Sequence, residues 1–296
     1  MTDKHPHTAH AMSVDVEDWF NATILQETGK IYPPGDAVMR NSLNLLEIFA
    51  QHDIQATWFF LGEVAEAFPD LVRRVADAGH ELGVHGFHHH QIRALTPENF
   101  RDSILRAKHA VEEAGGRQVL GYRAVDFSID TATWWALDIL LDAGFAYDSS
   151  IFPMRLPRYG IAGAQTGPHW IKTLEGRWIY EIPVTVCEML GLRLPFAGGG
   201  YFRLLPYGLL SLMMKWSARK RQVVFYMHPC EIEEGSAVPT APEDITSPEL
   251  QLINRRFISE KRGRKKGRKK LDCLLARYSF CSIADAFCVK NLVCPH

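Results

Sequence analysis

The sequence lacks the features that would place it in a membrane or in an oxidising compartment. No stretch approaches the about 20 consecutive apolar residues that cross a bilayer, and the start, MTDKHPHTAHAMSV, lacks the apolar core of a signal peptide. Six cysteines are spread along the chain without CxxC pairing, which favours reduced, buried thiols over a disulfide framework or a zinc knot. We therefore expect a cytoplasmic protein whose residues 1–10 form a disordered tail.

An excess of charge of one sign is also missing from the chain as a whole. The formal net charge is −1, yet residues 261–270, KRGRKKGRKK, carry eight positive charges, so the rest of the chain sums to −9 by subtraction. Such a run is typical of a solvated helix face, and it also fits a peripheral contact with an anionic membrane surface at the inner face of a membrane. No aromatic residues interleave with these charges, so we expect no nucleic-acid partner.

What the sequence does contain is a regular alternation of apolar runs and helical periods. With 296 residues, 47% of them hydrophobic, the chain can bury the core of one α/β barrel or of two smaller domains. Strands are predicted near 11–17, 54–60, 81–85, 119–124, 145–150, 177–186 and 222–229. Helices are predicted at 36–52, 63–78, 97–115 and 131–143, with another ending near 219. This alternation predicts βα units around a parallel sheet.

Two segments interrupt this rhythm, and a third follows it. The glycine-rich residues 197–208 and the Pro-, Glu- and Thr-rich residues 231–247 are predicted as loops. Residues from about 249 to 290 are predicted as helix, short strand and helix. No internal repeat or linker divides the chain, so we expect one domain over residues 11–296 with this basic segment as its C-terminal extension.

Polar residues end five of the apolar runs. In an α/β barrel the chemistry lies at the carboxyl ends of the strands, so these positions are the candidates for a site. The five clusters are SVDVEDW (13–19), VHGFHHH (84–90), GYRAVDF (121–127), YDSS (147–150) and FYMHP (225–229).

The first cluster places several acids close together. Side chains alternate along a strand, so Ser13, Asp15 and Glu17 share one face. With Asp18 they would repel in a dry pocket unless a cation or a guanidinium compensates them, and a solvated loop or a helix cap is the alternative. Arg123, which ends an apolar strand, needs an anionic partner, and Asp15 is a candidate; a purely structural salt bridge is the other reading.

The histidine run offers metal ligands at a useful spacing. If the chain forms a helical turn after Gly86, His89 lies about 40° around the axis from His85, with His88 about 60° the other way and His90 about 140° away. Two imidazoles and one carboxylate make the open three-ligand site of a hydrolytic zinc centre, although runs of surface histidines also occur by chance.

His228 closes the most apolar strand, VVFYM, and precedes Pro229. That places it where a general acid or base would stand, although a single histidine there is more often a satisfied core residue.

Taken together and in this order, the five motifs resemble the NodB-type polysaccharide deacetylases, carbohydrate esterase family four, from about residue 13 to residue 229. The similarity is greatest to the exosortase-associated exopolysaccharide branch, through SVDVEDWF, HGFHH, GYRA followed by FSI, YDSSIFP, AGGGYFRLLPY and FYMHP. The resemblance implies a distorted (β/α)7 barrel and a hydrolase that removes N-acetyl groups from amino sugars of a polysaccharide or lipid-linked glycan. A role in exopolysaccharide biosynthesis would follow.

The resemblance also implies a metal centre. The family's metal-binding carboxylate falls on Glu17 or Asp18, of which strand parity favours Glu17, and its histidine pair falls on His85 and His89. One divalent ion is expected, zinc first, with cobalt, nickel or manganese as alternatives.

Catalytic roles follow from the same resemblance. Asp15 would be the general base, Arg123 would orient it, and His228 would be the general acid. The backbone N–H of Asp126 would stabilise the oxyanion. The residue that orients His228 is left open between Asp148 and Glu181.

Substrate contacts and departures from the family pattern complete the prediction. Gly199 and Tyr201, in the glycine-rich segment, are candidates for contact with an N-acetylated glycan, with ordinary loop packing as the alternative. Val125 replaces the family's usual proline, and the carboxylate of Asp126 would lie beside an oxyanion. These departures keep two other readings open: a hydrolase of a non-sugar amide, as in allantoinase-like relatives, and a non-catalytic glycan-binding component.

Overall fold

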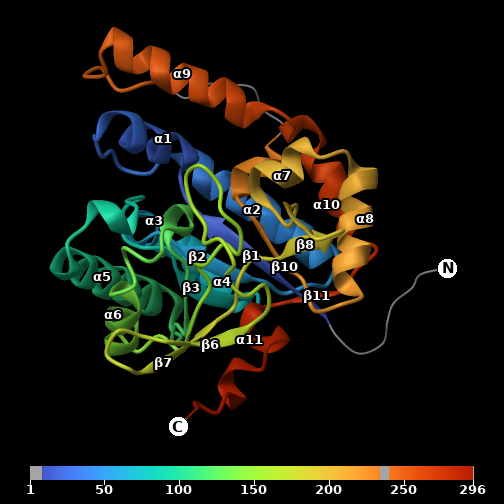
Figure 1. Ribbon diagram of the computed structural model, residues 1–296. Coiled ribbons are helices and arrows are strands. Elements are labelled where there is room, and N and C mark those ends of the chain that lie inside the picture. Colours follow the sequence, from blue (N-terminus) through green and yellow to red (C-terminus); the bar gives the residue numbers. More distant parts are fainter. Residues whose placement is uncertain (1–8, 234–239, 296) are drawn as a thin grey trace.

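A nearly closed barrel of parallel strands forms the centre of the computed structural model, which describes residues 9–233 and 240–295 (Figure 1). In this part of the chain seven parallel strands follow the order β10-β1-β2-β3-β4-β5-β7, and β6 joins β7 antiparallel. The strands of this sheet are β1 (His10–Val16), β2 (Thr57–Phe60), β3 (Glu81–Val84), β4 (Gly121–Tyr122), β5 (Tyr147–Asp148), β6 (His169–Lys172), β7 (Trp178–Glu181), β10 (Val224–Met227) and β11 (Phe280–Cys281). All seven residues of β1 are buried, as expected of a central parallel strand.

The two ends of the sheet are joined by irregular backbone rather than by a regular ladder. Thr185, beyond β7, donates its N–H to the Val224 carbonyl at 3.2 Å, and its hydroxyl accepts the Val224 N–H at 2.8 Å. The Tyr226 N–H donates to the Ala197 carbonyl at 3.0 Å. These contacts close the sheet onto β10, which confirms the predicted α/β fold of the distorted barrel type.

Helices cover the barrel on both sides (Figure 1). They are α1 (Trp19–Thr28), α2 (Asp36–Gln51), α3 (Gly62–Ala67), α4 (Pro69–Asp77), α5 (Pro97–Gly115), α6 (Ala136–Asp142), α7 (Gly199–Leu204), α8 (Tyr207–Ala218), α9 (Ser247–Lys261), α10 (Gly267–Leu275) and α11 (Ile283–Ala286). Helices α3, α5 and α6 lie together on one side and α7, α8 and α10 on the other, while α1 and α9 run side by side at the top of the view.

Several predicted elements need correction. The single helix predicted at 63–78 is two helices, because Pro69 cannot continue α3 and instead opens α4. The segment 197–208, predicted as a loop, contains α7. The sequence also did not indicate β6 or the separate antiparallel hairpin of β8 (Val186–Met189) and β9 (Leu192–Pro195).

Residues near both ends of the chain pair with the central sheet, which the sequence did not predict. His10, predicted to lie in a disordered tail, begins β1 and is buried, while residues 1–8 of that tail lie outside the described residues. The C-terminal segment is not a separate extension, because β11 pairs with β1 through His10–Phe280 and Ala11–Cys281. Within the described ranges, the helices are too short or too polar to pass through a bilayer.

Candidate metal centre and active site

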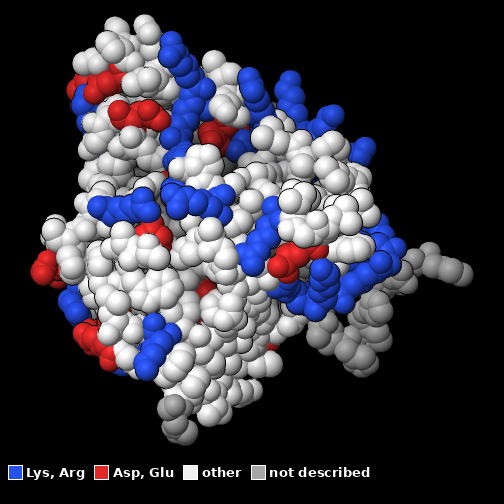
Figure 2. All heavy atoms as spheres, viewed as in Figure 1, with Lys and Arg blue, Asp and Glu red and all other residues white. Residues whose placement is uncertain are grey.

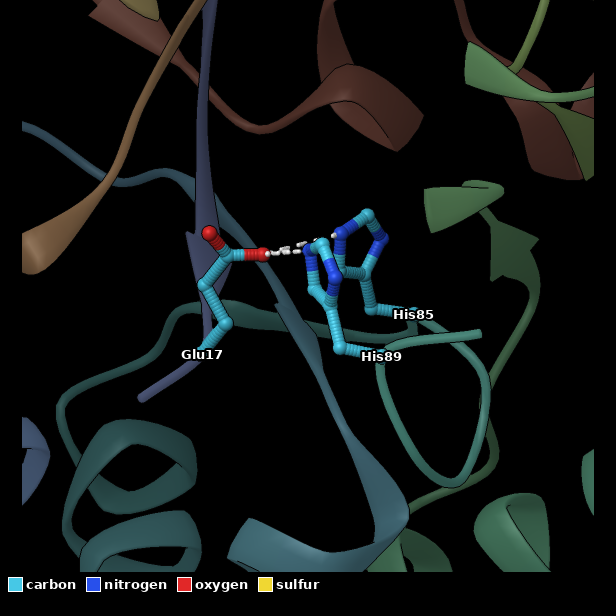
Figure 3. A group of neighbouring side chains, drawn as sticks. All are labelled: Glu17, His85 and His89. Atoms are coloured by element: carbon cyan, nitrogen blue, oxygen red, sulfur yellow. Dashed lines mark ion pairs between the residues drawn. The ribbon is translucent and has the colours of Figure 1, made fainter. Parts of the chain in front are cut away.

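Three potential metal ligands meet at the carboxyl end of the barrel (Figure 3). Glu17 directly follows β1, whereas His85 and His89 follow β3, two places away in the sheet. The Glu17 Oε2 atom lies 2.7 Å from His89 Nε2 and 3.6 Å from His85 Nε2. One ligand atom from each residue lies within 4.8 Å of the others, so a single cation could contact all three.

The loop that carries the histidines is shaped by backbone contacts rather than by the helical turn that the sequence suggested. Gly86 has a φ of +90°, and its carbonyl accepts the Gly62 N–H at 2.9 Å. The next carbonyl, of Phe87, accepts the Glu63 N–H at 3.1 Å. These first N–H groups of α3 hold the loop, and they bring His89 back toward His85.

The other two histidines of the run lie outside the cluster. His88 pairs with Glu63 at 2.5 Å, and the partly exposed His90 packs edge-to-face against His88.

Second partners fix the direction of both ligand rings. A carbonyl oxygen can only accept a hydrogen bond, so the His85 Nδ1–H donates to the Arg123 carbonyl at 2.8 Å. His89 Nδ1 lies 3.0 Å from the Gln26 side-chain amide. In both rings Nε2 is the atom that faces Glu17. His85 donates its Nδ1–H to a carbonyl, as metal-binding histidines do, whereas the Gln26 amide nitrogen donates to His89 Nδ1.

Opposite charges outweigh burial at Glu17 and His89. Burial alone would raise the pKa of Glu17, but the charges of His89 and His228 and hydrogen bonds from His85 and His89 hold that pKa well below its usual range. Burial would lower the pKa of His89, and Glu17 raises it instead. The Glu17 carboxylate is thus balanced by the charges of His89 and His228, a balance that a bound cation would also supply.

Asp18 is not part of this cluster. Its Oδ1 accepts the N–H groups of Phe20 and Asn21, which caps α1, and its Oδ2 accepts the Gly35 N–H at 2.7 Å. All of its acceptor capacity is directed at backbone, so of the two acids that the sequence left open only Glu17 faces the histidines.

A buried ion pair lies beside the histidines. Arg123 Nη1 donates to Asp15 Oδ1 at 2.8 Å and to Ser13 Oγ at 2.7 Å, and Nη2 donates to Ser149 Oγ at 2.9 Å. The guanidinium also stacks 4.4 Å above the Phe59 ring and is 0% exposed. The alternation predicted for β1 is present, and Arg123 holds the Asp15 carboxylate in one orientation.

The carboxylate of Asp126 is held by polar side chains. It accepts hydrogen bonds from Gln91 at 2.7 Å, Gln26 at 3.1 Å and Arg158 at 3.2 Å. Asp126 has a φ of +50° in the short 3-10 helix that also contains Val125. The arginine and the two amides offset the negative charge that the sequence placed beside an oxyanion.

His228 has an orienting partner that the sequence reasoning missed. Its Nδ1 lies 3.3 Å from Oε1 of Glu231, which is buried in the 3-10 helix η3 (Pro229–Ile232). Arg203 from α7 lies 3.5 Å from the same oxygen. Glu231 had been predicted to open a surface loop; its place three residues after His228, the spacing of one helical turn, is the signal that could have found it. Residues 234–239 of that loop lie outside the described residues.

The two acids proposed from the sequence as partners of His228 have other contacts. Asp148 Oδ1 accepts a hydrogen bond from Ser150, and Glu181 Oε1 accepts the Ile151 N–H at 3.0 Å. Burial raises the pKa of Asp148 to about 6, and burial together with the charge of Asp148 raises the pKa of Glu181 well above its usual range. Both acids are therefore engaged with neighbouring residues rather than with His228.

Several of these side chains line a cavity of about 70 Å³, enough for two waters or an acetyl group. Its walls include Asp15, Glu17, His85, His89, Asp126, Tyr159, Tyr226 and His228. A wider cleft of about 450 Å³ adjoins it and shares six of these residues.

The two predicted substrate contacts differ in position. Tyr201 lines the wide cleft near Tyr159, whose pKa is raised by burial and by the Tyr201 hydroxyl. Gly199 is buried instead: with a φ of +54°, a Cβ there would come within 2.3 Å of the Tyr226 hydroxyl. Gly199 therefore serves close backbone packing, and it is not among the residues that line the cleft, so its contact with substrate stays a prediction.

Comparison with known families divides the chain in two. The family profile described as polysaccharide deacetylase matches residues 35–145, and a profile described as a domain of unknown function, DUF3473, matches residues 149–288. The first range holds both histidine ligands and Arg123, and the second holds His228 and Glu231. Asp15 and Glu17 lie before both, so the site combines three separate parts of the sequence.

Two individual relatives of this chain are also named as deacetylases. A peptidoglycan deacetylase of Helicobacter pylori is 30% identical over 133 residues, which cover 43% of this chain and 42% of that protein. A peptidoglycan-N-acetylglucosamine deacetylase of Bacillus cereus is 33% identical over 72 residues, 24% of this chain and 26% of that protein. The chain thus matches less than half the length of these curated relatives.

A solved structure shares the fold along the whole chain. It is a Mycobacterium smegmatis protein assigned to the polysaccharide deacetylases, with a TM-score of 0.60 and 19% identity, covering 100% of this chain and 98% of that one. The profile match and the relatives show that this chain contains a polysaccharide deacetylase domain of the NodB, or carbohydrate esterase family four, type, and the solved structure shows the same fold.

Proposed function

We propose that this protein hydrolyses N-acetyl groups from amino sugars of a glycan, leaving free amines and acetate. The observation that carries the proposal is the convergence of an Arg123-held aspartate, the Glu17–His85–His89 cluster and His228 on one cavity of about 70 Å³. The deacetylase profile and the names of the relatives support the same reaction class.

The residues of the cluster fit a divalent metal. Two imidazole nitrogens and one carboxylate oxygen are a donor set typical of zinc and also accepted by cobalt, nickel or manganese, and the Arg123 carbonyl holds the second N–H of His85. Bound there, the ion would act as a Lewis acid that polarises the amide carbonyl and makes water more acidic.

The chain's own residues would carry the protons. Asp15, held in place by Arg123, would take a proton from the attacking water while the water oxygen bonds to the acetyl carbon. The Asp126 N–H would donate to the developing oxyanion. His228, oriented by Glu231, would deliver a proton to the amide nitrogen as the carbon–nitrogen bond breaks, because an amine leaves poorly without one.

Specific observations bear on the two alternative functions, glycan binding without catalysis and hydrolysis of a non-sugar amide. A non-catalytic glycan-binding role was suggested by Val125 and Asp126, but the hydrogen bonds and ion pair that hold the Asp126 carboxylate weaken that argument. A non-sugar amide would fit the 70 Å³ cavity as well as an N-acetyl group. The adjoining 450 Å³ cleft, with Tyr201 and Tyr159 on its wall, is the feature that favours a sugar chain.

We also propose a place for the reaction. Cys187 and Cys230 are buried and free, which suits a reducing cytoplasm. The motif similarity suggests exopolysaccharide biosynthesis, with a polysaccharide or a lipid-linked glycan as substrate. A peripheral contact between residues 261–270 and an anionic inner membrane face would bring the enzyme to such a glycan.

The test is acetate release from N-acetylglucosamine oligomers, with the protein measured as purified, after chelation, and after addition of zinc, cobalt, nickel or manganese. Allantoin is tested in parallel as a non-sugar amide. We expect acetate release that chelation removes and one metal restores. Turnover of allantoin alone would overturn the glycan assignment. A protein that binds stoichiometric metal yet hydrolyses no N-acetylated oligomer or polymer would support the binding role instead.

A further inference from the structure

An apolar surface lies on the side of the molecule formed by α7, α8 and the β8–β9 hairpin. Leu209, Leu212 and Trp216 follow at intervals of three and four residues, so they share one face of α8. That face points outward, because the three side chains are 42%, 53% and 36% exposed. The opposite face of α8, with Leu210 and Met214, is buried in the core.

The hairpin and the end of α7 enlarge this area. Leu190 and Leu192 at the hairpin turn are 90% and 62% exposed, and Leu204 at the end of α7 is 61% exposed. The Trp216 indole N–H donates to the Glu188 carbonyl at 2.9 Å, which ties α8 to the hairpin. Single exposed leucines are ordinary, but six large apolar side chains on adjoining elements mark an interaction surface.

The charges around this apolar surface are mostly basic, and Glu188 on the hairpin is paired with Arg193 and Arg221. The sequence contains no Asp or Glu from residue 189 to residue 230 or from 261 to 271. Exposed basic side chains flank the apolar area: Lys215, Arg219 and Lys220 on or just after α8, and Arg262, Lys265, Lys266 and Lys269 near the start of α10. Figure 2 shows an uncharged area over α7 and α8 with Lys and Arg side chains above and below it.

The basic run is anchored so that part of it faces outward. Arg264 is buried against Trp19 and pairs with Glu233, and the Lys270 ammonium donates to three carbonyls at the end of α7. The exposed lysines that remain form one wall of a groove of about 890 Å³, whose other wall is the apolar segment from Leu204 to Tyr207. Basic and apolar groups therefore adjoin within a single surface.

We infer that this surface docks onto an anionic lipid bilayer, with the leucines and Trp216 at the boundary of the acyl chains and the lysines and arginines at the lipid phosphates. Leucine and tryptophan flanked by Lys and Arg are the composition of interfacial membrane anchors. A second copy of the chain fits less well, because two such basic rims would repel each other.

Docking in this way would also present the active site to the membrane. Arg203 and Leu204 line both the basic groove and the catalytic cleft, so the mouth of the cleft lies next to the docked surface. The inference rests on the peripheral contact proposed above and extends it from charge alone to an apolar face. It does not depend on the deacetylation reaction.

Flotation with extruded vesicles tests the inference without any glycan. The full-length protein is mixed with vesicles of phosphatidylcholine alone or with phosphatidylglycerol, at low and physiological salt. We expect binding only to the anionic vesicles, weakened by salt. Lys265→Gln, Lys266→Gln, Lys269→Gln should weaken binding about 100-fold, since each basic residue near such a surface contributes about 1 kcal/mol. Leu209→Ser, Leu212→Ser should weaken it at least tenfold, because less apolar area is then inserted.

Matched controls keep the result specific. Leu105→Ser, Leu174→Ser removes two leucines that are 46% and 68% exposed elsewhere, and Arg73→Gln, Arg74→Gln, Arg117→Gln removes three exposed charges outside this surface. Both controls should bind as wild type does, and all variants should keep the wild-type acetate release from soluble oligomers.

Three results would overturn the inference. One is equal loss of vesicle binding in a control and its matched variant, or no binding of wild type to anionic vesicles. Another is a dimer in sedimentation that the leucine pair dissolves, which would assign the surface to a second copy. The third is binding that inorganic pyrophosphate abolishes while the leucine pair binds normally, which would indicate a phosphate site.

Discussion

Histidines at the two ends of the barrel have opposite electrostatic surroundings. At the amino ends of the strands, His10 packs against Tyr278 and Phe280, and His80 packs against Phe49 and Trp58. Burial lowers the pKa of both rings to about 4.

At the carboxyl ends, His89 and His228 are buried as well, but nearby acids reverse the effect. Glu17 raises the pKa of His89, and Glu17 together with Glu231 raises the pKa of His228 to about 10. Histidines are buried at both ends of the barrel, so burial alone does not distinguish the candidate site. The acids that follow β1 and β10 make the difference, and the predictions below test this.

The largest effect is expected from removing the two ligand rings. His85→Ala, His89→Ala should abolish both stoichiometric metal binding and acetate release, because one carboxylate alone holds a transition metal weakly. Elemental analysis of the purified protein and an acetate assay measure the two losses.

The neighbouring pair supplies the control. His88→Ala, His90→Ala changes the same number of histidines in the same loop but leaves the cluster intact, so metal content should stay near that of wild type. Equal metal loss in both double variants would mean that the run binds metal nonspecifically.

A smaller effect is expected where the base is removed but the metal ligands stay. Asp15→Asn should lower turnover by about 10²-fold or more, as expected for loss of a general base, while metal content is retained. Ser13→Ala removes a different hydrogen bond to Arg123 and should cost far less activity. If Asp15→Asn turned over as fast as Ser13→Ala, Asp15 would not be the base.

The next effect concerns the partner of His228. Glu231→Gln should lower kcat about tenfold with little change in KM, because the ring keeps its place but loses the anion that favours its protonated form. Glu181→Gln alters an equally buried acid that does not contact His228, so its kcat should remain near that of wild type. The reverse order of effects would restore Glu181 as the orienting residue.

The smallest effect is on stability, at the other end of the barrel. The pKa of His80 is about 4 when folded and near 6.5 when unfolded, so the unfolded chain binds more protons between these values. His80 should thus contribute fully above pH 6.5 and lose about 3 kcal/mol of stability as pH falls to 4.

Urea unfolding at a series of pH values measures this change. His80→Gln should be less stable at neutral pH but show a shallower loss toward pH 4 than wild type. An unchanged slope would mean that His80 is protonated in the folded protein.

Much of the barrel, and the meeting of the candidate site residues at one end of it, could be predicted because the signals are local. Strand alternation placed Ser13, Asp15 and Glu17 on one face, and the apolar runs ending in polar residues gave the carboxyl edge of the sheet. His85 and His89 were expected to converge through a helical turn. They do converge, but hydrogen bonds from the N–H groups at the start of α3 shape the loop instead.

The features that were missed depend on contacts distant in sequence or on very short elements. The sequence around Asp126 does not indicate its contacts with Gln26, Gln91 and Arg158, because these residues come from three separate segments. Helix α7 has only six residues and two glycines, so its composition reads as a loop. Glu231 was assigned to a loop by the prolines and acids that follow it, although it lies one turn from His228.

The pairing of β1 with β10 and β11 sets the order in which this protein can mature on the ribosome. Asp15 and Glu17 leave the exit tunnel early and β2 soon follows on one side of β1, but β10 and β11 on the other side are among the last strands to be translated. At about 5–20 residues per second the nascent chain would wait many seconds with its first strand unpaired on one side. Because His228 follows β10, the cavity that it lines with Asp15 and Glu17 can form only near the end of translation.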